Sequence, residues 1–180
     1  IAEGVYTPDP GGTDPTKSFT ITSSQDGLQI YGGFQSGDAF ADRDPDANRT
    51  VLSGDLGRDD DDPDGDGVID PNPDINGDPQ NLNGDNAHHV LFLDGRNATI
   101  SNNTVIDGVT ITAGQANSSN SSDQDGGGLY CDGYGGTCNP TIREVTFAGN
   151  YALDRGAALF NLGRTGGDAS PLIVNARFEN

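Results

Sequence analysis

Tryptophan and methionine are absent from this sequence, and hydrophobic residues make up only 32% of its 180 residues. A chain of this length can form one domain, but an ordinary two-layer globule would need more apolar volume. The composition therefore favours either a disordered chain or a fold in which each segment buries few side chains. Short strand-like islands of apolar residues argue against disorder, and they lie at 27–34, 49–56, 89–93, 104–111, 141–147 and 172–178.

Positive charge is also scarce. The chain has 9 Lys and Arg residues against 28 Asp and Glu residues, which gives a formal net charge of −19. Such a chain should be repelled by nucleic acid and by anionic membrane surfaces, so we expect neither as a partner. No run of 18 apolar residues is present, so no membrane insertion is expected within this chain. Divalent cations are the natural counter-partners of this charge.

The only two cysteines, Cys131 and Cys138, flank a Gly-rich stretch. Such a stretch can fold back far enough to close a disulfide, whereas the spacing fits no zinc-binding pattern. We therefore predict a disulfide, with two free thiols as the alternative. A disulfide would indicate an oxidising compartment.

No helical periodicity of useful length is present, and two passages between residues 126 and 180 have nearly the same sequence. Their aromatic and asparagine positions recur at steps of 30 or 31 residues: Tyr130 with Phe160, Phe147 with Phe178, and Asn150 with Asn180. A weaker copy at 105–111 places Ile111 36 residues before Phe147. Periods in this range are typical of stacked-repeat folds. The units are short, alternating and punctuated by Gly, so the stack should consist of β-strands.

In a coil of parallel strands, equivalent residues stack at the strand spacing of about 4.8 Å. We therefore predict one inward column of Ile111, Phe147 and Phe178. A second inward column should consist of Leu129–Tyr130 over Leu159–Phe160.

The Gly residues before Leu129 and Leu159 are predicted to form corners where a Cβ atom would clash. Asn150 over Asn180 suits a turn, because Asn tolerates left-handed backbone geometry and its amide can bond to neighbouring turns.

These motifs, Gly-Gly-x-Leu-aromatic and Phe-x-x-Asn, resemble the repeat of the polymorphic outer-membrane protein family of bacterial surface proteins. The residues that carry the resemblance are Gly127, Gly128, Leu129, Phe147, Asn150, Gly156, Leu159, Phe160, Phe178 and Asn180. Segments 4–8, 30–34, 43–45, 50–55 and 89–90 are similar to the leading part of large bacterial right-handed β-helix surface proteins. Gly156 departs from the pattern, because a single Gly stands where the repeat usually has two.

The resemblance implies an all-β, right-handed parallel β-helix (a solenoid) that is displayed or secreted, has adhesive or structural duties and carries no catalytic residues. We expect a single domain over 1–180, with irregular first turns at 1–55, an acidic loop insertion at 56–86 and regular turns at 87–180 that include a Ser/Asn-rich insertion. The chain opens on Ile1 and closes within a repeat, so we expect it to be a piece of a longer protein.

The acidic loop is the candidate metal site. Between residues 55 and 86 it holds eleven Asp residues and one basic residue, Arg58. Asp62, Asp64, Asp66 and Asp70 occupy positions 1, 3, 5 and 9 of a loop with Gly67 at the sharp turn. Calcium prefers six to eight oxygen ligands at this spacing, and the Val68 carbonyl can add one. Such loops resemble those of dockerins and thrombospondin type 3 repeats.

Position 12 of this loop is Pro73 instead of the usual Glu, so further ligands are needed. Asp74, Asn76 and Asp78 repeat the odd spacing and are candidates for a second site, and Asp85 or the run 59–61 are candidates to complete either one. The loop should be ordered by structural Ca²⁺, because about ten like charges close together repel one another. The alternative is a solvated acidic insertion without an ion.

An enzyme of the pectate-lyase type is the less favoured function. A lyase needs a base beside an acidic sugar, and the basic residues are scattered. A hydrolase needs facing carboxylates, for which Asp107, Asp125 and Asp154 are candidates without a shared motif. We therefore predict a non-enzymatic structural or adhesive domain, extracellular or on a bacterial cell surface, whose partners are calcium and cell-surface glycans or proteins. A subunit that binds copies of itself end to end into a filament is the alternative.

Overall fold

The protein is an all-β structure made of short parallel strands. The computed structural model describes residues 1–69 and 81–179, which form seventeen strands and three 3-10 helices. The three helices are single turns: η1 (Ser23–Gln25), η2 (Phe40–Asp42) and η3 (Ser121–Asp123).

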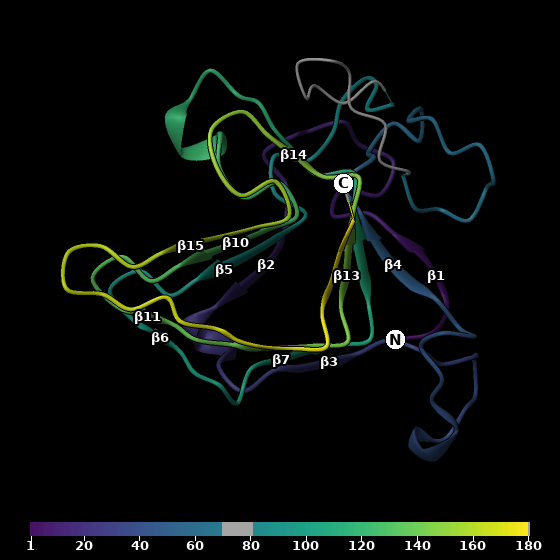
Figure 1. Ribbon diagram of the computed structural model, residues 1–180, viewed down its shortest axis with the longest axis horizontal. Coiled ribbons are helices and arrows are strands. Elements are labelled where there is room, and N and C mark those ends of the chain that lie inside the picture. The colour runs from purple at the N-terminus through teal and green to yellow at the C-terminus, as the bar shows by residue number, and fades with distance from the viewer. Residues whose placement is uncertain (70–80, 180) are drawn as a thin grey trace.

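Three sheets form the sides of a roughly triangular cross-section (Figure 1). One contains β2 (Phe19–Thr22), β5 (Leu91–Asp94), β10 (Leu129–Asp132) and β15 (Leu159–Leu162). A second contains β3 (Gln29–Tyr31), β7 (Val105–Asp107), β12 (Thr141–Arg143) and β16 (Leu172–Val174). The third contains β1 (Gly4–Tyr6), β4 (Thr50–Ser53), β8 (Thr110–Thr112), β13 (Thr146–Ala148) and β17 (Arg177–Glu179).

Two smaller pairs lie at corners of the triangle, and every pairing between strands is parallel. These pairs are β6 (Thr99–Ile100) with β11 (Thr137–Cys138), and β9 (Gln115–Ala116) with β14 (Tyr151–Ala152). The chain passes from one sheet to the next and then returns to the first, so each strand pairs with its equivalent one circuit earlier.

The register of the repeats agrees with the sequence prediction. Phe147 pairs with Ile111 on one side and with Phe178 on the other. Leu129 pairs with Leu159, and Tyr130 with Phe160. Equivalent residues therefore stack directly, and the rings of Phe147 and Phe178 lie 5.2 Å apart and nearly parallel.

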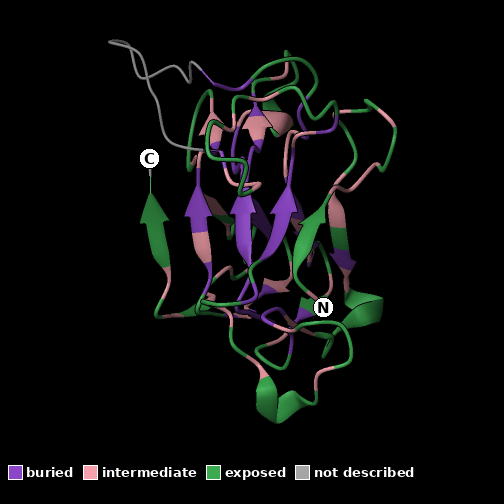
Figure 2. Ribbon diagram, turned by 90° about the vertical axis from the view of Figure 1, so that its right-hand side faces the viewer, coloured by how far each residue is buried: buried purple, intermediate pink, exposed green. Residues whose placement is uncertain are grey.

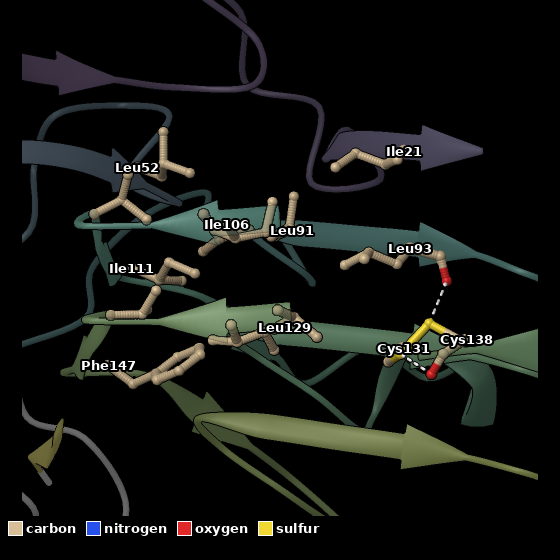
Figure 3. Close-up of a cluster of buried hydrophobic side chains, with 14 of the residues drawn as sticks. Ile21, Leu52, Leu91, Leu93, Ile106, Ile111, Leu129, Cys131, Cys138 and Phe147 are labelled. Atoms are coloured by element: carbon tan, nitrogen blue, oxygen red, sulfur yellow. Dashed lines mark hydrogen bonds between the residues drawn. A yellow bond between two sulfur atoms is a disulfide. The ribbon is translucent and has the colours of Figure 1, made fainter. Parts of the chain in front are cut away.

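The core fills the inside of the triangle (Figure 3). Ile111, Leu129 and Phe147 are fully buried there. Figure 2 shows how burial depends on position in the stack: β4, β8 and β13 are mostly buried, whereas β1 and β17 at the two edges of the same sheet are exposed. Phe178, on the last described turn, is accordingly 54% exposed although its register is the predicted one.

The predicted disulfide between Cys131 and Cys138 is confirmed, with the two Cα atoms 5.8 Å apart. Both cysteines are fully buried and belong to the core, so the bridge joins β10 to β11 inside the coil (Figure 3).

The prediction that Tyr130 and Phe160 face inward is wrong. Leu129 and Cys131 belong to the core, and alternate residues of a strand face opposite sides, so Tyr130 points outward. Its ring lies 5.3 Å from that of Phe160 and 5.6 Å from that of Phe92. The stacking is therefore real, but it covers the outer surface of the sheet.

Three predicted strands are each two strands joined at a corner. Segments 104–111, 141–147 and 172–178 bend at Gly108, Glu144 and Asn175, whose φ angles are 64°, 52° and 53°. A residue in the left-handed region turns the chain sharply, which apolar alternation alone does not reveal. These corner residues occupy equivalent positions in successive circuits.

The Gly corners before Leu129 are confirmed. A Cβ atom on Gly127 or Gly128 would come within 2.2 Å of the Tyr151 carbonyl oxygen or 2.5 Å of the Ala158 carbonyl oxygen. Before Leu159, Gly156 has a φ of 63°, as a left-handed corner requires.

Asn150 connects two circuits, but not through left-handed geometry. Its φ is not positive; Gly149 before it, with a φ of 55°, makes the turn. Asn150 is buried, donates from Nδ2 to the Ile111 carbonyl at 2.9 Å and accepts from the Gly114 N–H at 3.0 Å. Asn180 lies outside the described residues, so its stacking on Asn150 stays a prediction.

Replacing Phe147 by Ala should lower the free energy of unfolding by about 3–5 kcal/mol, because a fully buried aromatic side chain leaves a cavity. The matched control is Phe178→Ala, at the equivalent position one circuit later, which should cost about 1 kcal/mol or less because that ring is half exposed. Denaturant unfolding measures both. Equal losses would contradict the assignment of the core.

Candidate metal centre

The acidic loop leaves the coil after β4 and returns before β5, and its two arms are tied together. Asp55 and Asn86 form an antiparallel bridge, the Leu56 N–H donates to the Asp85 carbonyl, and the Asp61 N–H donates to the Asn81 carbonyl at 2.9 Å. Near its base, the outgoing arm of the loop is therefore hydrogen-bonded to the returning arm.

Three of the predicted metal ligands, Asp62, Asp64 and Asp66, lie together. One carboxylate oxygen from each lies within 4.8 Å of the others. Backbone N–H groups orient the carboxylates: Gly65 and Gly67 donate to the two Asp62 oxygens at 2.9 Å. Gly65 and Gly67 have φ angles of 73° and 81°, so Gly67 forms the sharp turn that the motif predicted. The backbone therefore wraps around the three carboxylates.

Ile69 anchors this segment to the coil. Its side chain is 3% exposed and packs with Leu82, Ala113 and Tyr151. Its N–H donates to the Thr112 hydroxyl on β8 at 3.0 Å. The coil thereby fixes the position of the carboxylates that precede Ile69.

Arg49 is part of this site, and the sequence pattern did not indicate it. It lies next to β4, and its guanidinium forms an ion pair with the Asp66 Oδ2 atom. Both side chains are largely exposed, so the pair is screened by solvent and contributes little to stability. A cation at Asp66 would compete with Arg49 for the same carboxylate.

The roles of the remaining predicted ligands are not tested by the structure. Val68 is half-buried and lies next to the described cluster. Asp70, Asp74, Asn76 and Asp78 lie outside the described residues, so their roles as ligands stay predictions.

A second acidic cluster consists of Asp55, Asp59 and Asp60, whose carboxylate oxygens also lie within 4.8 Å of one another. The Asp60 Oδ1 atom accepts from the Asn83 N–H and from Asn86 Nδ2. Burial raises the pKa of Asp60 to about 7, with smaller contributions from the negative charges of Asp55 and Asp59. Two hydrogen bonds from Asn83 and Asn86 act in the opposite direction.

The donors in both clusters are carboxylate oxygens. These are the ligands of hard cations such as Ca²⁺ and Mg²⁺, whereas zinc usually takes Cys or His as well. The acidic clusters between Asp55 and Asp66 can therefore hold a metal ion.

The carboxylates considered for hydrolysis are bound to arginines. Asp107 is fully buried on β7 and forms ion pairs with Arg43 and Arg143. Asp125 forms a two-pronged pair with Arg155 at 2.7 and 3.0 Å, and Arg155 also contacts Asp154 at 3.2 Å. The ion pairs of Asp107 join three successive circuits, and those of Asp125 join two.

Within residues 1–69 and 81–179, no helix is long and apolar enough to cross a membrane. Comparison of the sequence with known protein families found no match. No significant match was found among curated proteins or among solved structures. The resemblance described above therefore rests on its motif residues alone.

In calcium-free buffer, wild-type protein should lose stability relative to Asp60→Asn as the pH rises from about 4 to about 7. The folded-state pKa of Asp60, about 7, lies above its ordinary value of 3.8, so the folded protein binds more protons in this range. Between these two pKa values the unfolded chain has already released the proton that the folded protein still holds, so the free energy of unfolding falls as the pH rises.

Urea unfolding of chelator-treated wild type and Asp60→Asn at several pH values measures this difference. A difference that stays constant between about pH 4 and about pH 7 would contradict the buried position of Asp60.

Proposed function

We propose that this chain is a right-handed parallel β-helix that serves as a non-enzymatic structural or adhesive domain, extracellular or on a bacterial cell surface, stabilised by Ca²⁺. The observation that carries the proposal is the stack of in-register parallel strands with an acidic loop anchored on it through Ile69 and Thr112.

The direction of the chain supports a right-handed coil. With the C-terminal circuits nearest the viewer in Figure 1, the chain runs counterclockwise from β10 through β12 to β13. A path that turns counterclockwise as it approaches the viewer is right-handed. Right-handed crossovers between parallel strands are also strongly preferred in proteins, because strands twist to the right.

Calcium is the favoured ion because the ligands on offer are carboxylates in a short, turn-rich loop. Calcium accepts six to eight oxygen ligands in flexible geometry, whereas Mg²⁺ demands a near-ideal octahedron. Asp62 and Asp66 each accept backbone N–H bonds while keeping lone pairs for an ion. The ion would offset the repulsion among these charges and hold the loop against the coil.

The disulfide supports an extracellular location. Cys131 and Cys138 are bonded inside the core, and such bridges form and persist in oxidising compartments. The structural role is supported by the arginine pairs of Asp107 and Asp125, which tie circuits together. Adhesion to glycans or proteins rests on the family resemblance.

Removal of calcium should lower the melting temperature of the protein. At a calcium concentration 100 times Kd, binding stabilises the folded state by about 2.7 kcal/mol, which corresponds to roughly 5–10 °C for a chain of this size. The double variant Asp62→Asn/Asp64→Asn lacks the ligands of the Asp62 cluster, so its melting temperature should rise less with calcium than that of the wild type.

The control is Asp46→Asn, which removes an exposed aspartate outside the acidic loop and should keep the full calcium response. Scanning calorimetry with and without chelator measures all three proteins. A wild-type melting temperature that does not respond to chelator would refute the structural calcium site.

Incubation with acidic and neutral polysaccharides in the presence of calcium should release no product. Chromatography of the oligosaccharides and absorbance of unsaturated sugars detect hydrolase and lyase products respectively. Turnover that disappears in Asp107→Asn, with the fold intact by circular dichroism, would overturn the non-enzymatic assignment.

A further inference from the structure

The base of the acidic loop brings together polar groups from both of its arms. Asp55 lies two residues after β4, in the outgoing arm. Asn86 lies in the returning arm and forms an antiparallel β-bridge with Asp55. The Asn86 amide also points at the outgoing arm, because its Nδ2 atom lies 3.2 Å from the Asp60 Oδ1 atom. A ligand bound here would touch both arms of the loop.

The carboxylates of Asp55, Asp59 and Asp60 have the spacing of ligands around one ion. Their oxygens lie within 4.8 Å of one another. Two oxygens on opposite sides of a calcium ion are about 4.8 Å apart, because each calcium–oxygen distance is about 2.4 Å. A single ion can therefore contact all three side chains.

Two buried oxygen atoms at this place have no partner. Asp60 Oδ2 and Asn86 Oδ1 are inaccessible to solvent, and neither forms a hydrogen bond; no other side-chain N or O atom in residues 1–69 and 81–179 has both properties. Asn86 itself is only 3% exposed. Buried polar atoms are almost always paired, and the exceptions often mark a bound water or ion.

The Asn86 amide is suited to ligation. The oxygen and nitrogen of an amide are interchangeable by a half-turn of the side chain, which would place the oxygen about 3 Å from Asp60 Oδ1. Two oxygens that bind one ion at about 2.4 Å are commonly about 3 Å apart. In that orientation a cation would bind the Asn86 oxygen together with Asp60, and the amide would give up its hydrogen bond to the Asn83 carbonyl.

There is also space for an ion and its water. A cavity of about 280 Å³ lies under the loop. It is lined by Asp55 and Asp60 and also by Asp62 and Asp66. The cavity can supply water ligands, and it connects this cluster with the one at Asp62.

We propose that Asp55, Asp59, Asp60 and Asn86 form a second divalent-cation site, separate from the site at Asp62, Asp64 and Asp66, that clamps the two arms of the acidic loop at its base. Three carboxylates and one amide supply at least four oxygens, and bidentate carboxylates and water complete the coordination. This site does not depend on the function proposed for the chain, and it involves different ligands from the first site.

Calcium titration of the whole chelator-treated chain, followed by isothermal calorimetry, tests the proposal. Asp60→Asn should remove one equivalent of bound Ca²⁺ relative to wild type, or weaken that equivalent at least tenfold. Asp62→Asn/Asp64→Asn should remove a different equivalent, and the combined variant should lose both. Asp46→Asn is the matched control for loss of one negative charge.

A second pair of variants keeps the test valid if Asp60→Asn fails to fold. Asp59 is exposed, so Asp59→Asn should fold and still weaken the same equivalent. Asn86→Asp, which retains an oxygen ligand, should preserve binding, whereas Asn86→Leu should abolish it.

Three results would overturn the proposal. Asp60→Asn and Asp59→Asn could bind calcium with wild-type stoichiometry and affinity, which would leave a buried water as the occupant. The Asp60 and Asp62 variants could lose the same single equivalent, which would mean one shared ion. Wild-type protein could bind a single equivalent that only Asp62→Asn/Asp64→Asn removes, which would leave the first site and refute the second.

Discussion

The structure depends on parallel strand pairing. Each strand residue stacks on the residue at the equivalent position of the neighbouring circuit. Because identical backbone positions are stacked, an apolar position becomes an apolar column, as Leu52, Ile111, Phe147 and Phe178 do in one sheet. The same constraint aligns charges: Asp107 on β7 receives Arg43 from the circuit before and Arg143 from the circuit after. A buried carboxylate in such a position needs its partners, since removal of one would leave an uncompensated charge.

The same constraint explains why a long acidic loop is tolerated. The strands of each circuit pair only with neighbouring circuits, so an excursion between β4 and β5 interrupts no hydrogen-bonded ladder. Among the described residues, its contacts with the coil include the Ile69 side chain in its apolar pocket, the bond to Thr112 and the ion pair of Asp66 with Arg49. The carboxylates of Asp62, Asp64 and Asp66 are thereby held next to the coil, and we propose that a cation orders them.

How much could be predicted varies from residue to residue. The step from Phe147 to Phe178 gave the correct register, because in-register stacking makes a linear repeat into a contact. The inward direction of Tyr130 was wrong, because an aromatic residue is equally able to cover the outside of a sheet. The left-handed corners at Glu144 and Asn175 were missed, because neither residue type requires that backbone geometry. Arg49 and Asn86 were missed at the acidic clusters because Arg49 precedes the acidic loop and Asn86 lies 26 residues after Asp60, distances that local spacing cannot bridge.

Amide hydrogen exchange with and without calcium tests most directly the claim that the coil is self-supporting and that cations order the acidic loop. Calcium should slow exchange of the Gly65, Gly67 and Ile69 amides, which bond to Asp62 and Thr112, while the amides of β8 and β13 stay equally protected in both conditions. Loop exchange that is the same with and without calcium would contradict the account. So would a loss of protection throughout β8 and β13 when calcium is removed, because the coil itself would then depend on the ion.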